Sequence, residues 1–499
     1  MPTIWRIVAI VLILPGCAVQ PTPVTSEEVR DQVAVDRQLL AAASEPVDGP
    51  ISIYEAMARA VAFNLDLNLE RYKTDLVEKQ LSLSRHDQLP GIVVDHTTGG
   101  RSNYSGGSSQ SLLTGQQSLE SSTSADRYSK SNDLGLSWNI LDFGVSYYRA
   151  KQAADRVLLA NEQQKSVVNR ILKDVQNAYW RAVSYERLIE RLESLMAKVA
   201  QKLDESRQIE AQGLDTPLAT LLYQRELLDS SRHLYELYED LTLAKIELAS
   251  LMNVSAQQDF KLLDQPKPTQ VKPLPFDPEL METIALENRT ELKEVTYQKR
   301  INANEVKAAF VGILPGLNLD YAHNYNSNSF LFNTDWTDYS ARISWNLLDV
   351  FRYPATKALA EAQADTLDAQ RLALSAAVLT QVHIGVARYK HTSAEYLIAS
   401  AYNNTQDKIR LQIQFAVKAK SASEQTLIKE EMNALLAEVR YDVAYAKLEG
   451  AFADLFSAIG ISPTLEELDS SSLTALAASL EKYYEDRHNR SNEVLLNKP

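Results

Sequence analysis

Few residues of this chain have the types and spacing that an active site needs. The seven histidines are scattered and show no HExxH or other paired-ligand spacing; they include His86, His96, His323 and His383. The motifs Gly-x-Gly-x-x-Gly, Walker A and Gly-x-Ser-x-Gly are absent. Six methionines and one cysteine provide no thioether or thiol ladder for copper. We therefore expect no enzymatic activity, no cofactor and no bound metal.

The single cysteine, Cys17, stands where a covalent modification is expected. A basic residue, an apolar run over 7–14 and then small residues precede it, which is the order of an export signal. The run Leu14-Pro15-Gly16-Cys17 resembles the lipobox of bacterial lipoproteins. We predict a signal peptide over 1–16, then a lipidated Cys17 at the start of an extended segment over 17–50. An ordinary signal peptide with an incidental cysteine is the alternative.

Composition narrows the class of protein. The 499 residues carry a formal charge of −14, which disfavours a nucleic-acid partner because phosphate binding needs a basic face. Only 16 Gly and 17 Pro interrupt long tracts of Ala, Leu, Glu, Gln, Lys and Arg, so helix dominates. No internal run approaches the roughly 20 apolar residues of a transmembrane helix. If the chain spans a membrane, we expect it to do so with strands.

One stretch of the chain occurs twice. Ser137-Trp138-Asn139 returns as Ser344-Trp345-Asn346, an offset of 207 residues (345 − 138). Leu89-Pro90-Gly91 returns as Leu314-Pro315-Gly316, an offset of 225 (314 − 89). Offsets that stay constant over long stretches indicate an internal duplication. We therefore divide the mature chain into repeat 1 (51–254), a proline-rich linker (255–276), repeat 2 (277–462) and a C-terminal tail (463–499).

Long helices fill most of each repeat. A capping box of Ser52 and Glu55 predicts a first helix whose pattern continues to Leu89. Residues 147–211 hold no Pro or Gly, and a single helix there is roughly 95 Å long. That length favours a coiled coil or a helical barrel. Return helices follow each long helix, at about 217–252 and 423–459.

Two pairs of strands precede the long helices, at about 91–104 and 129–141 in repeat 1 and about 317–326 and 338–348 in repeat 2. Apolar and polar residues alternate along them, with Trp138 and Trp345 among the apolar ones. About ten residues is the length of a tilted membrane strand. Four strands cannot close a barrel, so several chains must share one if it lies in a membrane. A small soluble sheet below a helical domain is the alternative.

The duplicated plan, the Leu-Pro-Gly before each outward strand and the run Trp138-Asn139-Ile140-Leu141-Asp142 resemble the TolC family of outer-membrane efflux proteins. The resemblance covers about residues 51–462. It implies a mainly α fold in which three chains form one twelve-stranded β-barrel (3 × 4) in the outer membrane, above a long periplasmic α-helical barrel. It also implies a periplasmic adaptor and an inner-membrane transporter as partners, with Trp138 and Trp345 at the lipid boundary.

The resemblance also implies a gate at the periplasmic tips of the helix pairs. The first tip is Gly213-Leu214-Asp215, and the second includes Lys418 and Ser421. Lys420 then matches a basic residue that closes the tunnel, and Glu424 matches the first acidic position around the pore. Leu427 takes the second acidic position, where it forms an apolar constriction. An ordinary first-turn acid, favoured by the helix dipole, is the alternative for Glu424.

The sequence is compatible with three functions. The first is a passive, lipid-anchored outer-membrane exit duct of a tripartite efflux pump that exports small molecules. The second is the outer-membrane channel of a type I protein secretion system. The third, from another class, is a periplasmic coiled-coil scaffold lipoprotein that spans nothing. Alternating strands with outward tryptophans favour a channel over the scaffold.

Overall fold

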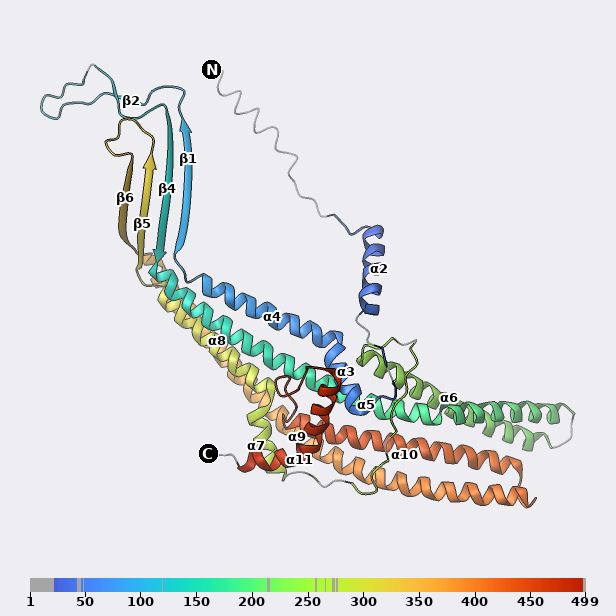
Figure 1. The fold of residues 1–499 in the computed structure, drawn as a ribbon. Coiled ribbons are helices and arrows are strands. Elements are labelled where there is room, and N and C mark those ends of the chain that lie inside the picture. The colour runs from blue at the N-terminus through green and yellow to red at the C-terminus, as the bar shows by residue number, and fades with distance from the viewer. Residues whose placement is uncertain are drawn as a thin grey trace.

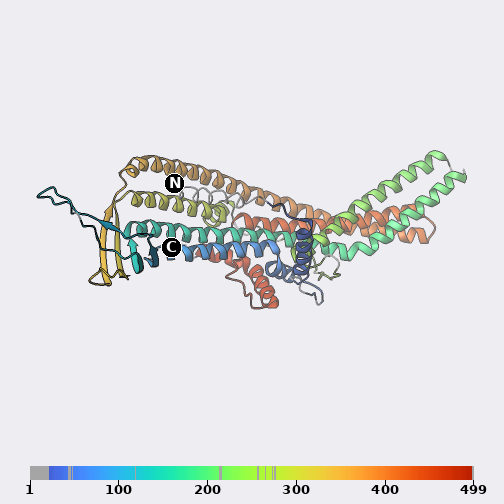
Figure 2. The same cartoon turned by 90° about the horizontal axis from the view of Figure 1, so that it is seen from above.

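The structure is a computed structural model that describes residues 22–42, 46–47, 49–118, 120–212, 216–255, 258–264, 266–271, 274 and 277–496. The predicted signal peptide, the predicted lipidation site Cys17 and the first predicted tip, Gly213-Leu214-Asp215, lie outside these residues. The molecule is long and narrow, with strands at one end and helices running away from them (Figure 1; Figure 2).

The internal duplication is visible in the structure as two antiparallel helix pairs. They are α5 (Ile140–Gln212) with α6 (Pro217–Leu251), and α9 (Leu347–Lys418) with α10 (Glu424–Ala458). The first residues of α5 and α9 lie 207 positions apart (347 − 140), as do those of α6 and α10 (424 − 217). The duplication inferred from the sequence is therefore confirmed. No helix in the described part of the chain is long and apolar enough to cross a membrane.

A break divides the first helical stretch of each repeat, where the sequence pattern predicted one continuous helix. Repeat 1 has α3 (Ile53–Phe63) and α4 (Leu65–His86), and repeat 2 has α7 (Pro278–Asn288) and α8 (Thr290–Gly312). Asn64 causes the first break, because its side chain accepts hydrogen bonds from the backbone N–H groups of Asp66 and Leu67 and so caps a new helix. The predicted cap of α3, Ser52, accepts from the N–H of Glu55 as expected.

Four strands form one antiparallel sheet in the order β1-β4-β5-β6. Their bounds are β1 Gly91–Gly100, β4 Tyr128–Asn139, β5 Gly316–Asn326 and β6 Asp335–Ser344. The loop between β1 and β4 carries a small hairpin of β2 (Gly106–Gly107) and β3 (Ser122–Thr123). The predicted strands at 91–104, 129–141 and 338–348 ran too far at their ends. Asn139 and Asn346 end two of them, because each side chain caps the helix that follows.

The two faces of the sheet differ in polarity. One face places Leu136 beside Tyr321, and Tyr321 beside Tyr339, and all three side chains are exposed in the single chain. The opposite face places Asp320 between Ser137 and Ser340, whose hydroxyls donate to its carboxylate at 2.6 Å and 3.1 Å. In a soluble sheet the apolar face is covered by the core and the polar face meets water. Here the apolar face is the uncovered one, and the polar side chains of the other face bond to one another.

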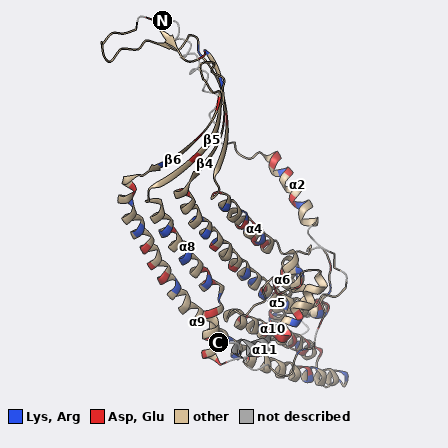
Figure 3. Cartoon of the chain, turned by 60° about the vertical axis from the view of Figure 1, so that its left-hand side comes forward, with Lys and Arg blue, Asp and Glu red and all other residues tan. Residues whose placement is uncertain are grey.

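The helices continue the order of the strands. Below the sheet, α4 packs on α5, α5 on α8 and α8 on α9, so α4 and α9 are the outer helices of this layer (Figure 3). Farther down, α10 packs on both α5 and α9, and α6 packs on α5 and meets α10 in a shared apolar seam. The largest apolar core lies where the two regions meet, around Tyr179, Met57 and Leu248.

Two further helices flank this plan. The segment predicted to be extended over 17–50 contains α2 (Ser26–Ala42), so that prediction was wrong for these residues. A capping box explains the helix, because the Glu28 carboxylate accepts from the N–H of Thr25 and the Thr25 hydroxyl accepts from the N–H of Glu28. All described residues of α2 are exposed, and it stands apart from the rest of the chain (Figure 3). In the tail, α11 (Leu473–Leu496) packs on α3.

Candidate functional site

The second predicted tip is a short turn between α9 and α10. α9 ends at Lys418, and Lys420 adopts a φ of 59°, which reverses the chain. The N–H and hydroxyl of Ser421 both donate to the carbonyl of Ala416, which satisfies a free carbonyl at the helix end. Lys418, Lys420 and Ser421 are all exposed. This tip therefore offers two lysines and a hydroxyl to anything that approaches from below.

Glu424 is the first residue of α10, and its carboxylate already has a partner in the chain. Lys202 of α5 donates to it at 3.1 Å, and the same ammonium donates to Glu205 at 2.8 Å. These hydrogen bonds raise the pKa of Lys202, the bond to Glu205 first and the bond to Glu424 second. The side chain of Glu424 is still 71% exposed. The structure thus places the predicted pore acid at a contact between the two helix pairs.

Leu427, the other predicted constriction residue, is half-buried in the single chain. Its neighbour Ile428 is buried and packs with Leu195, Leu227 and Leu435 in the apolar seam of α5, α6 and α10. Leu427 therefore lies beside the seam and keeps part of its surface free. Glu424 and Leu427 thus lie within the first turn of α10, and Lys202 of α5 contacts this turn through Glu424.

A series of ion pairs joins α5 to α10 along their length. Basic residues lie on α5 and acidic residues on α10, in the pairs Arg187–Asp442, Arg191–Glu438, Lys198–Glu431 and Lys202–Glu424. We call these four pairs the ion ladder. From Arg187 to Arg191 to Lys198, α5 advances by four and then seven residues. The partners on α10 run back from Asp442 to Glu438 to Glu431 by the same four and seven residues. This is the spacing of facing positions in antiparallel coiled coils.

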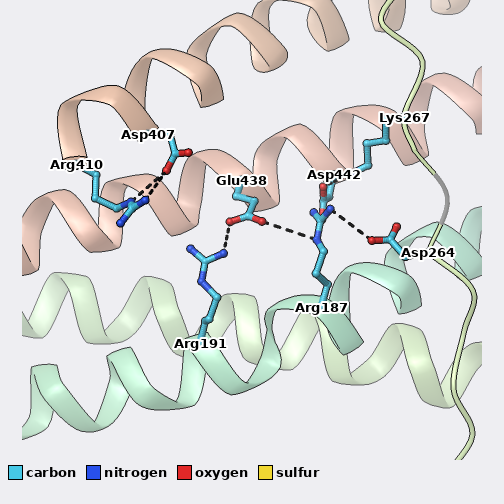
Figure 4. Close-up of polar contacts among 8 residues, drawn as sticks. All are labelled: Arg187, Arg191, Asp264, Lys267, Asp407, Arg410, Glu438 and Asp442. Carbon is cyan, nitrogen blue, oxygen red and sulfur yellow. Dashed lines mark hydrogen bonds and ion pairs between the residues drawn. The ribbon is translucent and has the colours of Figure 1, made fainter. Parts of the chain in front are cut away.

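The acid of the innermost pair of the ion ladder is buried. Asp442 is 2% exposed and contacts both Arg187 and Lys267, a residue of the linker between the repeats (Figure 4). Burial alone lowers the pKa of Arg187, but Asp442 and Glu438 outweigh this effect and raise it. One carboxylate therefore ties together α5, α10 and the linker. Breaking a buried ion pair leaves an uncompensated charge, so this contact holds its three partners firmly.

Aromatic hydroxyls fasten the same linker nearby. Tyr396 of α9 donates to the carbonyl of Pro268 at 2.6 Å, and Tyr179 of α5 donates to the carbonyl of Leu263 at 2.9 Å. The ammonium of Lys267 also lies 4.7 Å from the ring centre of Tyr441. The linker between the repeats is thus fastened to α5, α9 and α10 at this level.

The sequence interpretation missed the ion ladder, although a signal was present. Glu424, Glu431 and Glu438 recur every seven residues, and Arg191 and Lys198 have the same spacing. A heptad of one charge on each of two helices indicates facing helices. The sequence does not say which helix faces which, and that is why the partners stayed unassigned.

The two tryptophans lie at the junctions between strand and helix. Trp138 belongs to the end of β4 and meets the ring of Phe143 edge-on, with ring centres 5.8 Å apart. Trp345 follows β6 and donates from Nε1 to the carbonyl of Ile313 at 2.9 Å. The two tryptophans are 36% and 53% exposed in the single chain. Among the described residues, no three His, Cys, Asp or Glu side chains are grouped to hold a metal ion.

Known structures share this architecture. No family model matches the sequence, and no curated protein matches it. Among solved structures, the chain is similar to a membrane protein from Pseudomonas aeruginosa, with 18% identity and a TM-score of 0.62 over 82% of this chain and 90% of that one. It is also similar to the CmeC outer membrane channel of Campylobacter jejuni, with 13% identity and a TM-score of 0.62 over 86% of this chain and 89% of that one.

A third similar structure is CusC, whose description concerns folding and transmembrane channel formation. The identity is 16% and the TM-score 0.60, over 82% of this chain and 92% of that one. The matches span between 89% and 92% of each solved chain. At these identities the likeness establishes the fold. The chain therefore has the fold of the TolC-family outer-membrane channel proteins.

Proposed function

We propose that this chain is a passive outer-membrane exit duct that works as a homotrimer in a tripartite efflux pump. In this proposal, the sheet lies in the outer membrane and the helices reach into the periplasm. The helix tips meet a periplasmic adaptor, and an inner-membrane transporter supplies the energy. The duct then exports small molecules and catalyses no reaction.

The observation that carries this proposal is the sheet with two open edges. β1 and β6 each have one unpaired side, and the strands alternate in direction from β1 to β6. An open edge in lipid leaves backbone N–H and C=O groups without partners, at a cost of several kcal/mol each. Pairing β6 of one copy with β1 of the next keeps every neighbour antiparallel. Three copies of the sheet then close into a barrel with its polar face inside.

The outer helices support the same assembly. Exposed apolar side chains run down α4 at coiled-coil spacing, namely Leu65, Leu69, Tyr72, Leu76 and Leu83. The other outer helix, α9, exposes Leu359 and Leu372 at the same level. Such stripes are unfavourable in water and mark a surface that is covered in the assembled protein. A neighbouring copy that pairs with the open edges of β1 and β6 can thus also cover the exposed stripes of α4 and α9.

Two sites complete the proposal. Lys418, Ser421 and the residues Gly213-Leu214-Asp215 are the proposed contacts for the adaptor, and Lys420, Glu424 and Leu427 the proposed gate. Cys17 is the proposed lipid anchor. Labelled palmitate that enters the wild-type chain but not a Cys17→Ser variant is the expected result for the anchor. Equal labelling of both would overturn it.

Purified protein in planar bilayers tests the main proposal. We expect a heat-stable oligomer on gels, retention in membranes after carbonate washing, and discrete single-channel conductance. The four-stranded sheet needs partner copies to close, so conductance and oligomer should appear together. Release by carbonate with no stable oligomer and no conductance would identify a periplasmic scaffold instead.

A further inference from the structure

A cleft of about 720 Å³ lies where the break between α3 and α4 meets the C-terminal tail. Val61, Phe63 and Arg71 line it from the two sides of the break, and tail residues between 465 and 476 line it from the other direction. None of its described lining residues belongs to the sheet, the ion ladder or the proposed gate. The volume falls within the roughly 300–1,000 Å³ of sites that bind small molecules.

Most of the cleft wall is apolar, and part of it is fixed by the core. Leu465, Leu468, Leu473 and Leu476 of the tail line the cleft together with Phe63. Leu468 and Leu476 are 6% and 4% exposed and belong to the largest apolar core of the chain. The wall is therefore preformed, and an alkyl chain that lies against it is removed from water.

Arg71 is the one charged residue among the described residues that line the cleft. Its half-buried guanidinium donates to the side-chain oxygen of Asn68 and to the carbonyl of Val61, both at 3.0 Å. Burial lowers the pKa of Arg71, and no carboxylate in the described part of the chain opposes that effect. Since arginine stays charged in proteins, the cleft contains a partly desolvated cation without an acid.

In the second repeat, the arginine at the break between the helices is paired with a carboxylate. Arg289 lies between α7 and α8 and donates to backbone carbonyls, as Arg71 does. Glu291 accepts two further hydrogen bonds from Arg289, at 2.7 Å and 3.0 Å, and neutralises it. The first repeat thus has the guanidinium without the acid, and this guanidinium lines a cleft.

The tail contributes groups that also favour an anion. The hydroxyl-bearing residues Ser470 and Ser472 line the cleft beside Leu473, the first residue of α11. Ser472 is the N-cap of this helix, because its hydroxyl accepts from the N–H of Ala475 at 3.1 Å. The N-terminus of a helix carries a partial positive charge. Arg71 and the start of α11 therefore bring positive charge to the same cleft.

We propose that this cleft binds a single-chain anionic amphiphile, whose carboxylate or phosphate head pairs with Arg71 and whose alkyl chain lies against Leu468 and Leu476. Fatty acids and monoacyl phosphates have this chemistry. The head supplies the acid that Arg71 lacks, through charge-assisted hydrogen bonds, and the chain covers the apolar wall. A bound molecule then joins the break between α3 and α4 to the start of α11. The inference does not depend on the proposed duct, because it needs neither the oligomer nor conductance.

Isothermal titration calorimetry tests the binding, with the purified full-length protein in an uncharged detergent and decanoate as the probe. We expect saturable binding at a single site per chain. Inorganic phosphate has the charge without the chain, and decanol has the chain without the charge. Each should bind about tenfold more weakly or less, because each loses one of the two contacts.

Three outcomes of this titration would overturn the proposal. Decanol that binds as tightly as decanoate would show apolar partitioning without a role for the cation. Phosphate that binds as tightly would show a site for bare anions. The absence of saturable decanoate binding would show that the cleft takes no such molecule.

Variants assign the binding to the cleft. Arg71→Gln should raise the dissociation constant of decanoate about tenfold or more, whereas Arg71→Lys keeps the charge and should retain most of the affinity. Arg85→Gln is the matched control, since Arg85 is an exposed residue of the same helix, and it should leave binding unchanged.

A second variant covers the case in which Arg71→Gln fails to fold. Leu473→Glu places a carboxylate at the first position of α11, where an acid suits the helix, and inside the wall of the cleft. It should weaken decanoate binding by a similar factor without lowering the unfolding temperature. Decanoate binding that is unchanged in Leu473→Glu and in any folded Arg71→Gln protein would place the ligand elsewhere and overturn the proposal.

Discussion

Lys202 on α5 and Glu424 on α10 form the ion pair of the ladder nearest the helix tips, with the ammonium nitrogen 3.1 Å from the carboxylate. The two residues are 222 positions apart in sequence and belong to different repeats. Their contact ties the start of α10 to α5. On α10, Glu424 lies within one turn of Leu427, the other residue of the proposed gate.

We expect Glu424→Ala to raise single-channel conductance in planar bilayers. The variant removes an exposed contact worth roughly 0–1 kcal/mol per copy, so α10 gains freedom at the tip without loss of the fold. Leu427→Ala should act in the same direction by removing apolar bulk from the proposed constriction. Lys418→Ala, an exposed residue of the same tip, is the control and should leave conductance unchanged. Unchanged conductance in both test variants would place the constriction elsewhere on the tips.

The same contact predicts an effect of alkaline pH. The pKa of Lys202 is raised above its ordinary value of 10.5 by Glu205 and Glu424. A raised pKa means that the pair contributes its stability fully below pH 10.5 and loses it as pH rises through the higher folded value. In the proposed gate, this loss frees the start of α10. Conductance should therefore increase at the alkaline end of a scan from about pH 9 to about pH 12.

A Lys202→Arg variant isolates this residue from the other lysines that titrate in the same range. Arginine keeps its charge throughout the scan, so the variant should lose most of the alkaline increase in conductance. If Lys202→Arg follows the wild-type curve, the effect belongs to another group.

The buried acid of the ion ladder should matter for stability. Asp442→Asn removes the buried carboxylate that Arg187 and Lys267 share and leaves Arg187 only its longer ion pairs with Glu438 and Asp264. We expect a loss of about 3 kcal/mol in the free energy of unfolding. Thermal unfolding of the solubilised protein measures it. Asp407→Asn is the matched control, since Asp407 is exposed and pairs only with Arg410 one turn away, and it should cost under about 1 kcal/mol (Figure 4). Equal losses in both variants would contradict the role given to burial.

The ends of the two return helices predict a difference between the repeats. Gly460 after α10 and Asn253 after α6 both adopt positive φ, at 75° and 53°. A Cβ at Gly460 would also lie 2.9 Å from the backbone carbon of Asn288, so it meets main chain that cannot turn aside. We expect Gly460→Ala to destabilise the protein by about 2 kcal/mol.

Asn253→Gly serves as its counterpart, because glycine adopts positive φ without strain. That variant should keep or slightly raise the unfolding temperature. A Gly460→Ala protein as stable as the wild type would show that the backbone near Asn288 gives way.

Much of the architecture was predictable because it depends on local pattern. Alternation along the strands, the absence of Pro and Gly over 147–211, and the two copies of Trp-Asn-φ-Leu-Asp each follow from neighbouring residues. The errors were local as well. Asn64 and Asn139 end their elements by capping the next helix, and the sequence patterns gave more weight to apolar spacing than to these side chains. The prolines before α2 hid the capping box of Thr25 and Glu28.

The sequence by itself determined the duplication, the order of strands and long helices, and the charges available on each helix. Only the tertiary structure decided which charges meet. Lys202 with Glu424 and Arg187 with Asp442 are each joined across more than two hundred residues, and a heptad of acids on α10 fits any basic helix beside it. The choice is made by packing: once Leu195 and Leu435 close the seam of α5 and α10, only residues at matching heights can pair.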